Sequence, residues 1–239
     1  MNSKRSRLGF YALLGVAFIV VAFVVSDILV RDMARERIEG MIVSSLKSSG
    51  DVVVDISVFP ALKALNGRID SVYIHAQDVT IGEVPMSEIE VDARNVAWPV
   101  GLGQDEIMDL EDAIADGKIK IVMSEDDVND GIISKISGLS NFRMSLKDGK
   151  SCMNGRATIL SLSFNLFAEG IISAGADNTV NYSVERIGIE DVELTDSLLE
   201  IARALLNFKF SLPKFPFALK LDSIDIQDDV VVIRGSANR

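Results

Sequence analysis

Alternation of apolar and polar residues recurs from about residue 51 onward, and it constrains the fold more than any other feature of this sequence. Ile89, Val91 and Ala93 alternate with acidic residues, and segments 142–147 and 160–166 follow the same period of two. Such a period is typical of antiparallel strands covered on one face only. Asp148–Gly149 predicts a tight hairpin turn between two of the strands. Weaker strand patterns cover residues 52–59, 69–81, 118–123, 179–189, 218–226 and 230–234.

Two short helices are predicted between the strands. The first begins at Ser124, whose side chain can cap the helix ahead of three acidic residues, and its apolar positions run to Ile136. The second begins near Thr195 and runs to Leu206. Each helix directly follows a predicted strand, and the two units lie 71 residues apart, which hints at an internal duplication.

The N-terminal part of the chain has a different pattern of apolar and charged residues. Leu8 to Val25 contains no charged residue and follows Lys4, Arg5 and Arg7, so it predicts one transmembrane helix with the N-terminus inside and the main domain outside. A secretory signal cleaved near Ser26 is the alternative, although the run is long for one. We expect residues 1–26 to form the anchor, 27–48 an amphipathic connecting helix and 49–239 the extracytoplasmic domain.

Charge and composition exclude several classes of function. The net charge of −11 repels phosphate backbones, so nucleic acid is a poor partner and any lipid contact should be local and apolar. The single cysteine, Cys152, cannot form an intramolecular disulfide, and the single histidine, His75, cannot form a histidine metal site alone. We interpret Cys152 as a half-buried strand residue and His75 as an ordinary surface imidazole.

No catalytic motif is recognisable. Glu88, Glu90 and Asp92 alternate with apolar residues, which predicts that they line an outer face and do not pair in a cleft. The acidic stretch 126–137 lacks two of the oxygen ligands of a calcium loop, and the chain has no Gly-x-Ser-x-Gly. We therefore expect a binding protein, with no enzymatic activity, no metal and no cofactor.

Two Phe–Pro segments are the most distinctive local chemistry. They span residues 56–62 and 210–217. Proline cannot donate to a strand ladder, so both segments should lie at strand ends or edges, where aromatic residues form a rim. Closure of an ordinary core is the plainer interpretation.

These segments carry a resemblance to a known family. Phe59-Pro60-x-Leu62, Leu65-x-Gly67-Arg68-Ile69-x-x-Val72-x-Ile74 and Leu212-Pro213-x-Phe215-Pro216-Phe217-x-Leu219-x-Leu221 resemble the LmeA family of bacterial phospholipid-binding envelope proteins. The resemblance implies an α+β fold in which a curved antiparallel sheet wraps around a long helix. It is similar to tubular lipid-binding (TULIP) folds, with an apolar tunnel for acyl chains. The family is associated with building lipid-linked mannan in the actinobacterial cell wall.

The resemblance also implies which residues line the tunnel or its mouth. They are Phe59, Leu62, Leu65, Val72, Ile74, Phe215, Phe217, Leu219 and Leu221. The strand 160–166 is long enough to line such a tunnel, which adds Leu162, Phe164 and Leu166. We expect a membrane-tethered, extracytoplasmic phospholipid-binding protein that supports envelope assembly enzymes. A structural or interaction module with a filled core is the alternative.

Overall fold

The computed structural model describes most of the chain beyond residue 46. The described ranges are 47–48, 50–60, 63, 66–97, 114, 116–139, 141–159, 162–189, 196–212 and 219–237. The predicted membrane anchor, nearly all of the predicted connecting helix and the second Phe–Pro segment from residue 213 lie outside these ranges. Among the helices that are described, none has the length and apolar character needed to cross a membrane.

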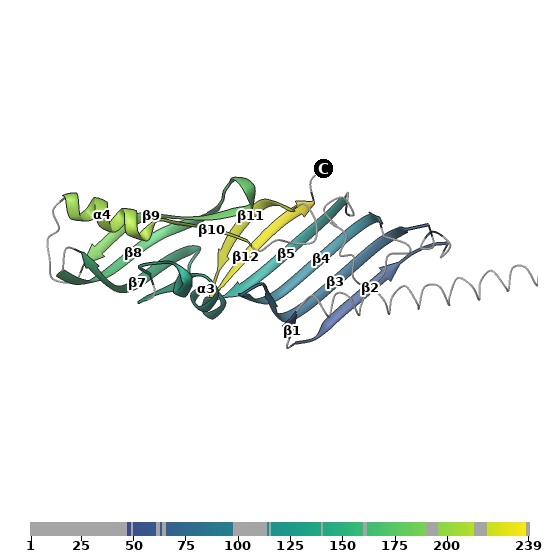
Figure 1. The fold of residues 1–239 in the computed structure, drawn as a ribbon, viewed down its shortest axis with the longest axis horizontal. Helices are drawn as coiled ribbons and strands as arrows, with labels where there is room; N and C mark the ends of the chain where they lie inside the picture. Colours follow the sequence, from purple (N-terminus) through teal and green to yellow (C-terminus); the bar gives the residue numbers. More distant parts are fainter. Residues whose placement is uncertain are drawn as a thin grey trace, which may run out of the picture.

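Antiparallel strands dominate the fold and form two sheets that lie end to end (Figure 1). The seven-stranded sheet has the order β1-β3-β4-β5-β12-β11, and β2 shares the outer edge of β3 with β1. Its strands are β1 (Lys47–Ser48), β2 (Val52–Ser57), β3 (Arg68–Ile81), β4 (Val84–Ala97), β5 (Asp116–Ser124), β11 (Leu219–Gln227) and β12 (Val230–Ala237).

The five-stranded sheet is inserted in the sequence between β5 and β11. Its order is β10-β9-β8-β7-β6, and β11 of the first sheet packs beside its strands β6 and β8. Its strands are β6 (Phe142–Lys147), β7 (Lys150–Ile159), β8 (Leu162–Ala174), β9 (Thr179–Ile189) and β10 (Phe208–Ser211). The β6–β7 turn confirms the hairpin prediction, because both Asp148 and Gly149 have positive φ angles.

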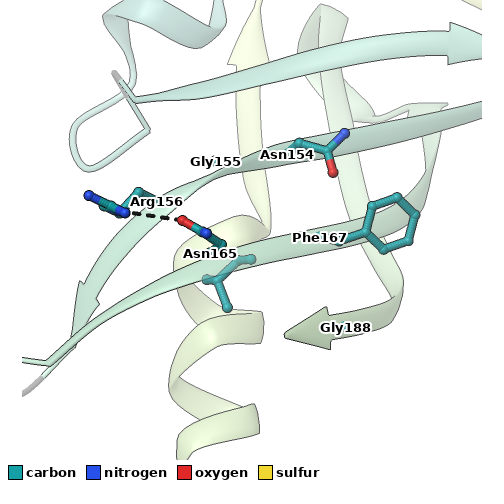
Figure 2. Close-up of a pocket in the computed structure, with 7 residues that line it drawn as sticks. Asn154, Gly155, Arg156, Asn165, Phe167 and Gly188 are labelled. Atoms are coloured by element: carbon teal, nitrogen blue, oxygen red, sulfur yellow. Dashed lines mark hydrogen bonds between the residues drawn. The ribbon is translucent and has the colours of Figure 1, made fainter. Parts of the chain in front are cut away.

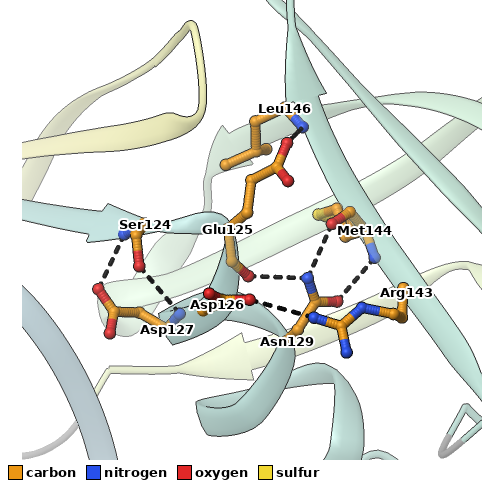
Figure 3. Close-up of polar contacts among 8 residues, drawn as sticks. All are labelled: Ser124, Glu125, Asp126, Asp127, Asn129, Arg143, Met144 and Leu146. Carbon is orange, nitrogen blue, oxygen red and sulfur yellow. Dashed lines mark hydrogen bonds and ion pairs between the residues drawn. The ribbon is translucent and has the colours of Figure 1, made fainter.

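Both predicted helices form, one after β5 and the other after β9. Helix α3 (Glu125–Gly131) has a capping box in which Ser124 and Asp127 exchange hydrogen bonds of 2.8 and 3.1 Å (Figure 3). It is shorter than the pattern predicted, because the chain continues after Gly131 as the short 3₁₀ turn Ile133–Lys135. Helix α4 (Asp196–Leu206) lies along the five-stranded sheet, next to β9 (Figure 1).

In the long strands β3 and β4 the alternation of buried and exposed residues is interrupted at two places, yet the same face of the sheet stays apolar. Buried residues jump from Ala76 to Val79 where Asp78 has a positive φ, and from Ala93 to Val96 where Asn95 does. On the neighbouring strand, the spacing of buried residues changes at the positions paired with these breaks. Irregularities of this kind bend strands, which curls the sheet while its apolar face stays buried.

Side chains of α3 join the two sheets at the open edge of β6 (Figure 3). The carboxamide of Asn129 donates to the carbonyl of Met144 and accepts from its N–H, at 2.8 and 2.7 Å. Glu125 accepts from the N–H of Leu146 at 2.6 Å, and the Asp229 N–H of the β11–β12 turn donates to the Leu146 carbonyl. These hydrogen bonds satisfy backbone groups of β6 that would otherwise pair with a further strand.

The fold differs from the expected one in three respects. We expected one curved sheet, and the structure has two, because α3 caps the edge of β6 and none of the described strands pairs with it there. The pattern did not predict β10, and it placed residues 47 and 48 in the connecting helix 27–48, whereas Lys47–Ser48 pair with β3 as β1. The antiparallel strands with few helices are confirmed; wrapping of a sheet around a long helix stays a prediction.

Candidate functional site

The apolar face of the seven-stranded sheet carries a row of side chains that crosses six strands. Backbone register joins neighbours in this row from β2 to β11. The row consists of Val54, Ile74, Val91, Ile119, Gly235 and Leu221. Two residues implied by the resemblance, Ile74 and Leu221, therefore lie on one row although 147 positions separate them in the sequence.

An adjacent row has small residues in its centre. Ile56, Val72, Ala93 and Gly117 are register neighbours, and Ala237 and Leu219 continue the row beyond Gly117. A Cβ atom at Gly117 would lie 2.9 Å from Cγ2 of Ile114, and one at Gly235 would lie 2.7 Å from Cδ1 of Leu219. The small residues thus form a trough that the side chains of Ile114 and Leu219 enter.

The five-stranded sheet extends the same apolar surface. Buried side chains of both sheets and of α4 form one continuous cluster. The ring of Tyr182 stacks on Phe208 with centroids 5.2 Å apart, and a Cβ at Gly170 would lie 2.8 Å from Cζ of that tyrosine. Burial raises the pKa of the Tyr182 hydroxyl. We name the shared apolar face of the two sheets the inner surface.

Several of the predicted site residues lie on this inner surface. Val72, Leu166, Leu219 and Leu221 are buried, and Ile74 is partly buried against the core. Leu162 and Phe164 belong to β8, but their side chains lie outside the described part, as do Leu62, Leu65, Phe215 and Phe217. That these residues line a tunnel stays a prediction.

Phe59 lies just beyond the end of β2 and is 65% exposed. Its N–H donates to Oδ2 of Asp70 at 2.7 Å, and Nζ of Lys63 donates to Oδ1 at 2.9 Å. These two hydrogen bonds, that of Lys63 foremost, lower the pKa of Asp70. The carboxylate fixes the backbone beneath an aromatic side chain that faces solvent.

The opposite face of the seven-stranded sheet is polar, as predicted for its acidic residues. Nζ of Lys120 lies 3.0 Å from Glu88 and 3.7 Å from Glu90, and the hydrogen bond to Glu88 raises the pKa of Lys120. His75 lies on the same face, 3.9 Å from Glu88. Nowhere in the described ranges do three His, Cys, Asp or Glu side chains gather in a way that could hold a metal ion.

A groove on the outer face of the five-stranded sheet escaped the sequence analysis. Its volume is about 470 Å³ (Figure 2). It is lined by Asn154, Gly155, Arg156, Asn165, Leu166, Phe167 and Gly188. The only available signal was the outward position of Phe167 in the alternating pattern of β8, which an isolated surface aromatic residue also explains.

The fold and its surfaces define a class of β-rich binding protein, with a long apolar inner surface and ion-paired carboxylates on the outside. A family model described as LmeA-like phospholipid-binding matches residues 25–236. The chain belongs to this family, which confirms the resemblance and supports phospholipid binding. Comparisons with curated proteins and with solved structures return no match.

Proposed function

We propose that this protein is a membrane-tethered, extracytoplasmic phospholipid-binding protein that holds acyl chains along its inner surface. The single observation that carries the acyl-chain assignment is the continuous apolar cluster that the inner faces of both sheets share, from Val72 and Leu219 to Leu166. Each buried methylene of a ligand contributes about 0.8 kcal/mol, so acyl chains bind there without help from headgroup charge. That mode of binding suits a chain with a net charge of −11.

The proposed tether is the uncharged run Leu8 to Val25, with the domain outside the cytoplasm. Its support is the length of the run and the three cations that precede it. Protease added to intact spheroplasts should then degrade the domain without lysis. Protection of the domain until the cells are lysed would contradict the extracytoplasmic assignment. A shortened N-terminus in the mature protein would favour the cleaved signal.

A role in assembling envelope lipids or lipoglycans, alongside envelope enzymes, is the proposed biological context. It rests on the family association given above. A deletion strain should accumulate or lose a lipid-linked envelope intermediate, and the wild-type gene should restore it. An unchanged envelope lipid and lipoglycan profile in the deletion strain would contradict this role.

The decisive experiment identifies lipid that remains bound to the full chain during gentle purification in a non-ionic detergent. Wild-type protein should carry phospholipid that native mass spectrometry detects after the detergent is removed in the gas phase. Ala93→Leu places a larger side chain in the centre of the trough and should reduce the bound lipid at least tenfold. Val53→Leu, at an exposed position of β2, is the matched control and should retain it.

The same experiment separates the lipid-binding protein from a structural module with a filled core. Overpacking of a filled core costs typically 1–3 kcal/mol. Ala93 is 1% exposed, so Ala93→Leu should lose about this much stability whether or not the protein binds lipid, and its loss of lipid counts only while circular dichroism shows the variant folded. Wild type that carries no bound lipid would favour the structural module.

A further inference from the structure

The outer groove of the five-stranded sheet combines an aromatic ring with polar side chains in a defined pattern. Backbone register places Asn154, Phe167 and Gly188 on one row across β7, β8 and β9. The next row toward the β7–β8 hairpin consists of Arg156 and Asn165, and the row on the other side consists of Cys152, Glu169 and Arg186. Phe167, 41% exposed, therefore lies between two rows that each carry an arginine.

Positive charge is concentrated on this face. Lys150 pairs with Glu169 at 2.5 Å, and Arg186 acts on the same carboxylate, so the pKa of Glu169 is lowered. Nε of Arg156 donates to Oδ1 of Asn165 at 3.4 Å (Figure 2), and no ion pair in the described ranges involves this guanidinium. The rows on either side of Phe167, together with Lys150, thus carry three cations and the carboxylate of Glu169, in a chain whose net charge is −11.

We infer that this groove is a binding site for a phosphate ester of a small polyol. The terminal nitrogens of Arg156 match the oxygens of a phosphate group, to which a guanidinium can donate two parallel hydrogen bonds. The amide of Asn154 both donates and accepts, as hydroxyl groups require. The ring of Phe167 offers an apolar wall to the carbon skeleton, and the volume of about 470 Å³ lies in the range of small-molecule sites.

Gly188 keeps the floor of the groove open. A Cβ atom there would lie 3.6 Å from Cδ1 of Phe167, an ordinary contact, and the backbone at Gly188 needs no positive φ. A larger side chain at residue 188 therefore fills the groove without displacing the strand. The site faces away from the inner surface and does not depend on the acyl-chain binding proposed above.

Two sources supply this chemistry, the headgroup of a glycerophospholipid and a soluble phosphate ester. Isothermal titration of the full chain in a phosphate-free, non-ionic detergent should use three probes: sn-glycerol 3-phosphate, dihexanoylphosphatidylglycerol and inorganic phosphate. We expect glycerol 3-phosphate to bind more tightly than inorganic phosphate. Arg156→Gln and Gly188→Val should each weaken its binding at least tenfold, and Arg156→Lys should recover part of the loss. Ser183→Val, on the same strand but outside the groove, should bind as wild type.

The probes and variants of this titration distinguish the two ligand sources from each other, and the outer groove from the inner surface. A short-chain lipid that binds more tightly than glycerol 3-phosphate, and loses affinity in Gly188→Val, identifies a lipid headgroup; equal affinities identify a soluble ester. Folded Arg156→Gln and Gly188→Val should still carry the copurified lipid that Ala93→Leu loses, so the two proposals fail separately. No binding of glycerol 3-phosphate, or binding that both groove variants leave unchanged, would overturn the inference.

Discussion

The carboxamide of Asn129 pairs with the backbone of Met144 as a strand residue would, accepting from its N–H at 2.7 Å and donating to its carbonyl at 2.8 Å. Asn129 is 5% exposed, and it also donates to the carbonyl of Glu125 at 2.8 Å. One side chain thus closes the edge of one sheet from a helix that belongs to the other. The two sheets are held at this junction by hydrogen bonds that solvent cannot readily replace.

Replacing Asn129 by leucine should destabilise the fold strongly. The substitution leaves the N–H and the carbonyl of Met144 buried without partners, at about 1–3 kcal/mol for each group. We expect the free energy of unfolding, measured by urea titration with circular dichroism, to fall by about 2–6 kcal/mol. Asp126→Asn is the control, because the ion pair of Asp126 with Arg143 is exposed and should contribute at most about 1 kcal/mol. Equal losses in both variants would contradict the role of Asn129.

Two glycines of the five-stranded sheet should respond to alanine in opposite ways. A Cβ at Gly170 would lie 2.6 Å from the carbonyl oxygen of Ser183 and 2.8 Å from the ring of Tyr182, so Gly170→Ala should cost about 1–3 kcal/mol. At Gly188 the Cβ meets only ordinary contacts, and alanine loses less backbone entropy on folding, so stability should be unchanged or slightly higher. Thermal unfolding of the two variants beside wild type measures the difference.

The loop that presents Phe59 should loosen in acid. Hydrogen bonds from Lys63 and from the Phe59 N–H lower the pKa of Asp70, so the folded state binds this proton less readily than the unfolded state does. The stabilisation is therefore complete above the ordinary carboxyl pKa of about 4 and is lost as pH falls through the lower value of the folded protein. Hydrogen exchange at the Phe59 N–H, corrected for intrinsic rates, should lose protection over that range. In Asp70→Asn the protection should be independent of pH there.

The thiol of Cys152 should react slowly in the folded protein. Burial, and then the charge of Glu169, raise the pKa of Cys152, so less thiolate is present near neutral pH. Iodoacetamide at pH 8 should alkylate the folded chain more slowly than the urea-unfolded chain. Glu169→Gln should increase the rate only in part, because burial is the larger cause. A folded-state rate equal to that of the unfolded chain would show that the thiol is unperturbed.

The parts of the fold that the sequence predicted depend on neighbours a few residues apart. Strand β6 and strand β9 have the predicted bounds, and the capping box of Ser124 and Asp127 needs only residues three positions apart. The outward position of Glu88 and Glu90 followed from the same alternation and is confirmed by their pairing with Lys120. β10 was missed because four residues, Phe208–Ser211, are too few to establish a period.

The sequence predicted an apolar binding surface, but not how distant strands combine to form it. The family resemblance implied that Val72 and Ile74 line an apolar surface, but it could not state that Leu219 and Leu221 continue the same two rows across β5 and β12. The groove around Phe167 combines residues of β7, β8 and β9, and its shape depends on the absence of a side chain at Gly188. No single strand carries the pattern of such a site.

The sequence by itself determined much of the local structure of this protein: most of its strands, its turn at Asp148–Gly149, the cap of α3 and the family to which it belongs. Each of these depends on backbone preference, side-chain capping or the period of apolar residues within one segment. Only the tertiary structure decided that the strands divide into two sheets, that Asn129 closes the edge between them and that Ile74 lies in one row with Leu221. Before the chain folds, distant strands could pair in many registers and at several sheet edges. Burial and hydrogen bonding across the whole molecule select one of these pairings.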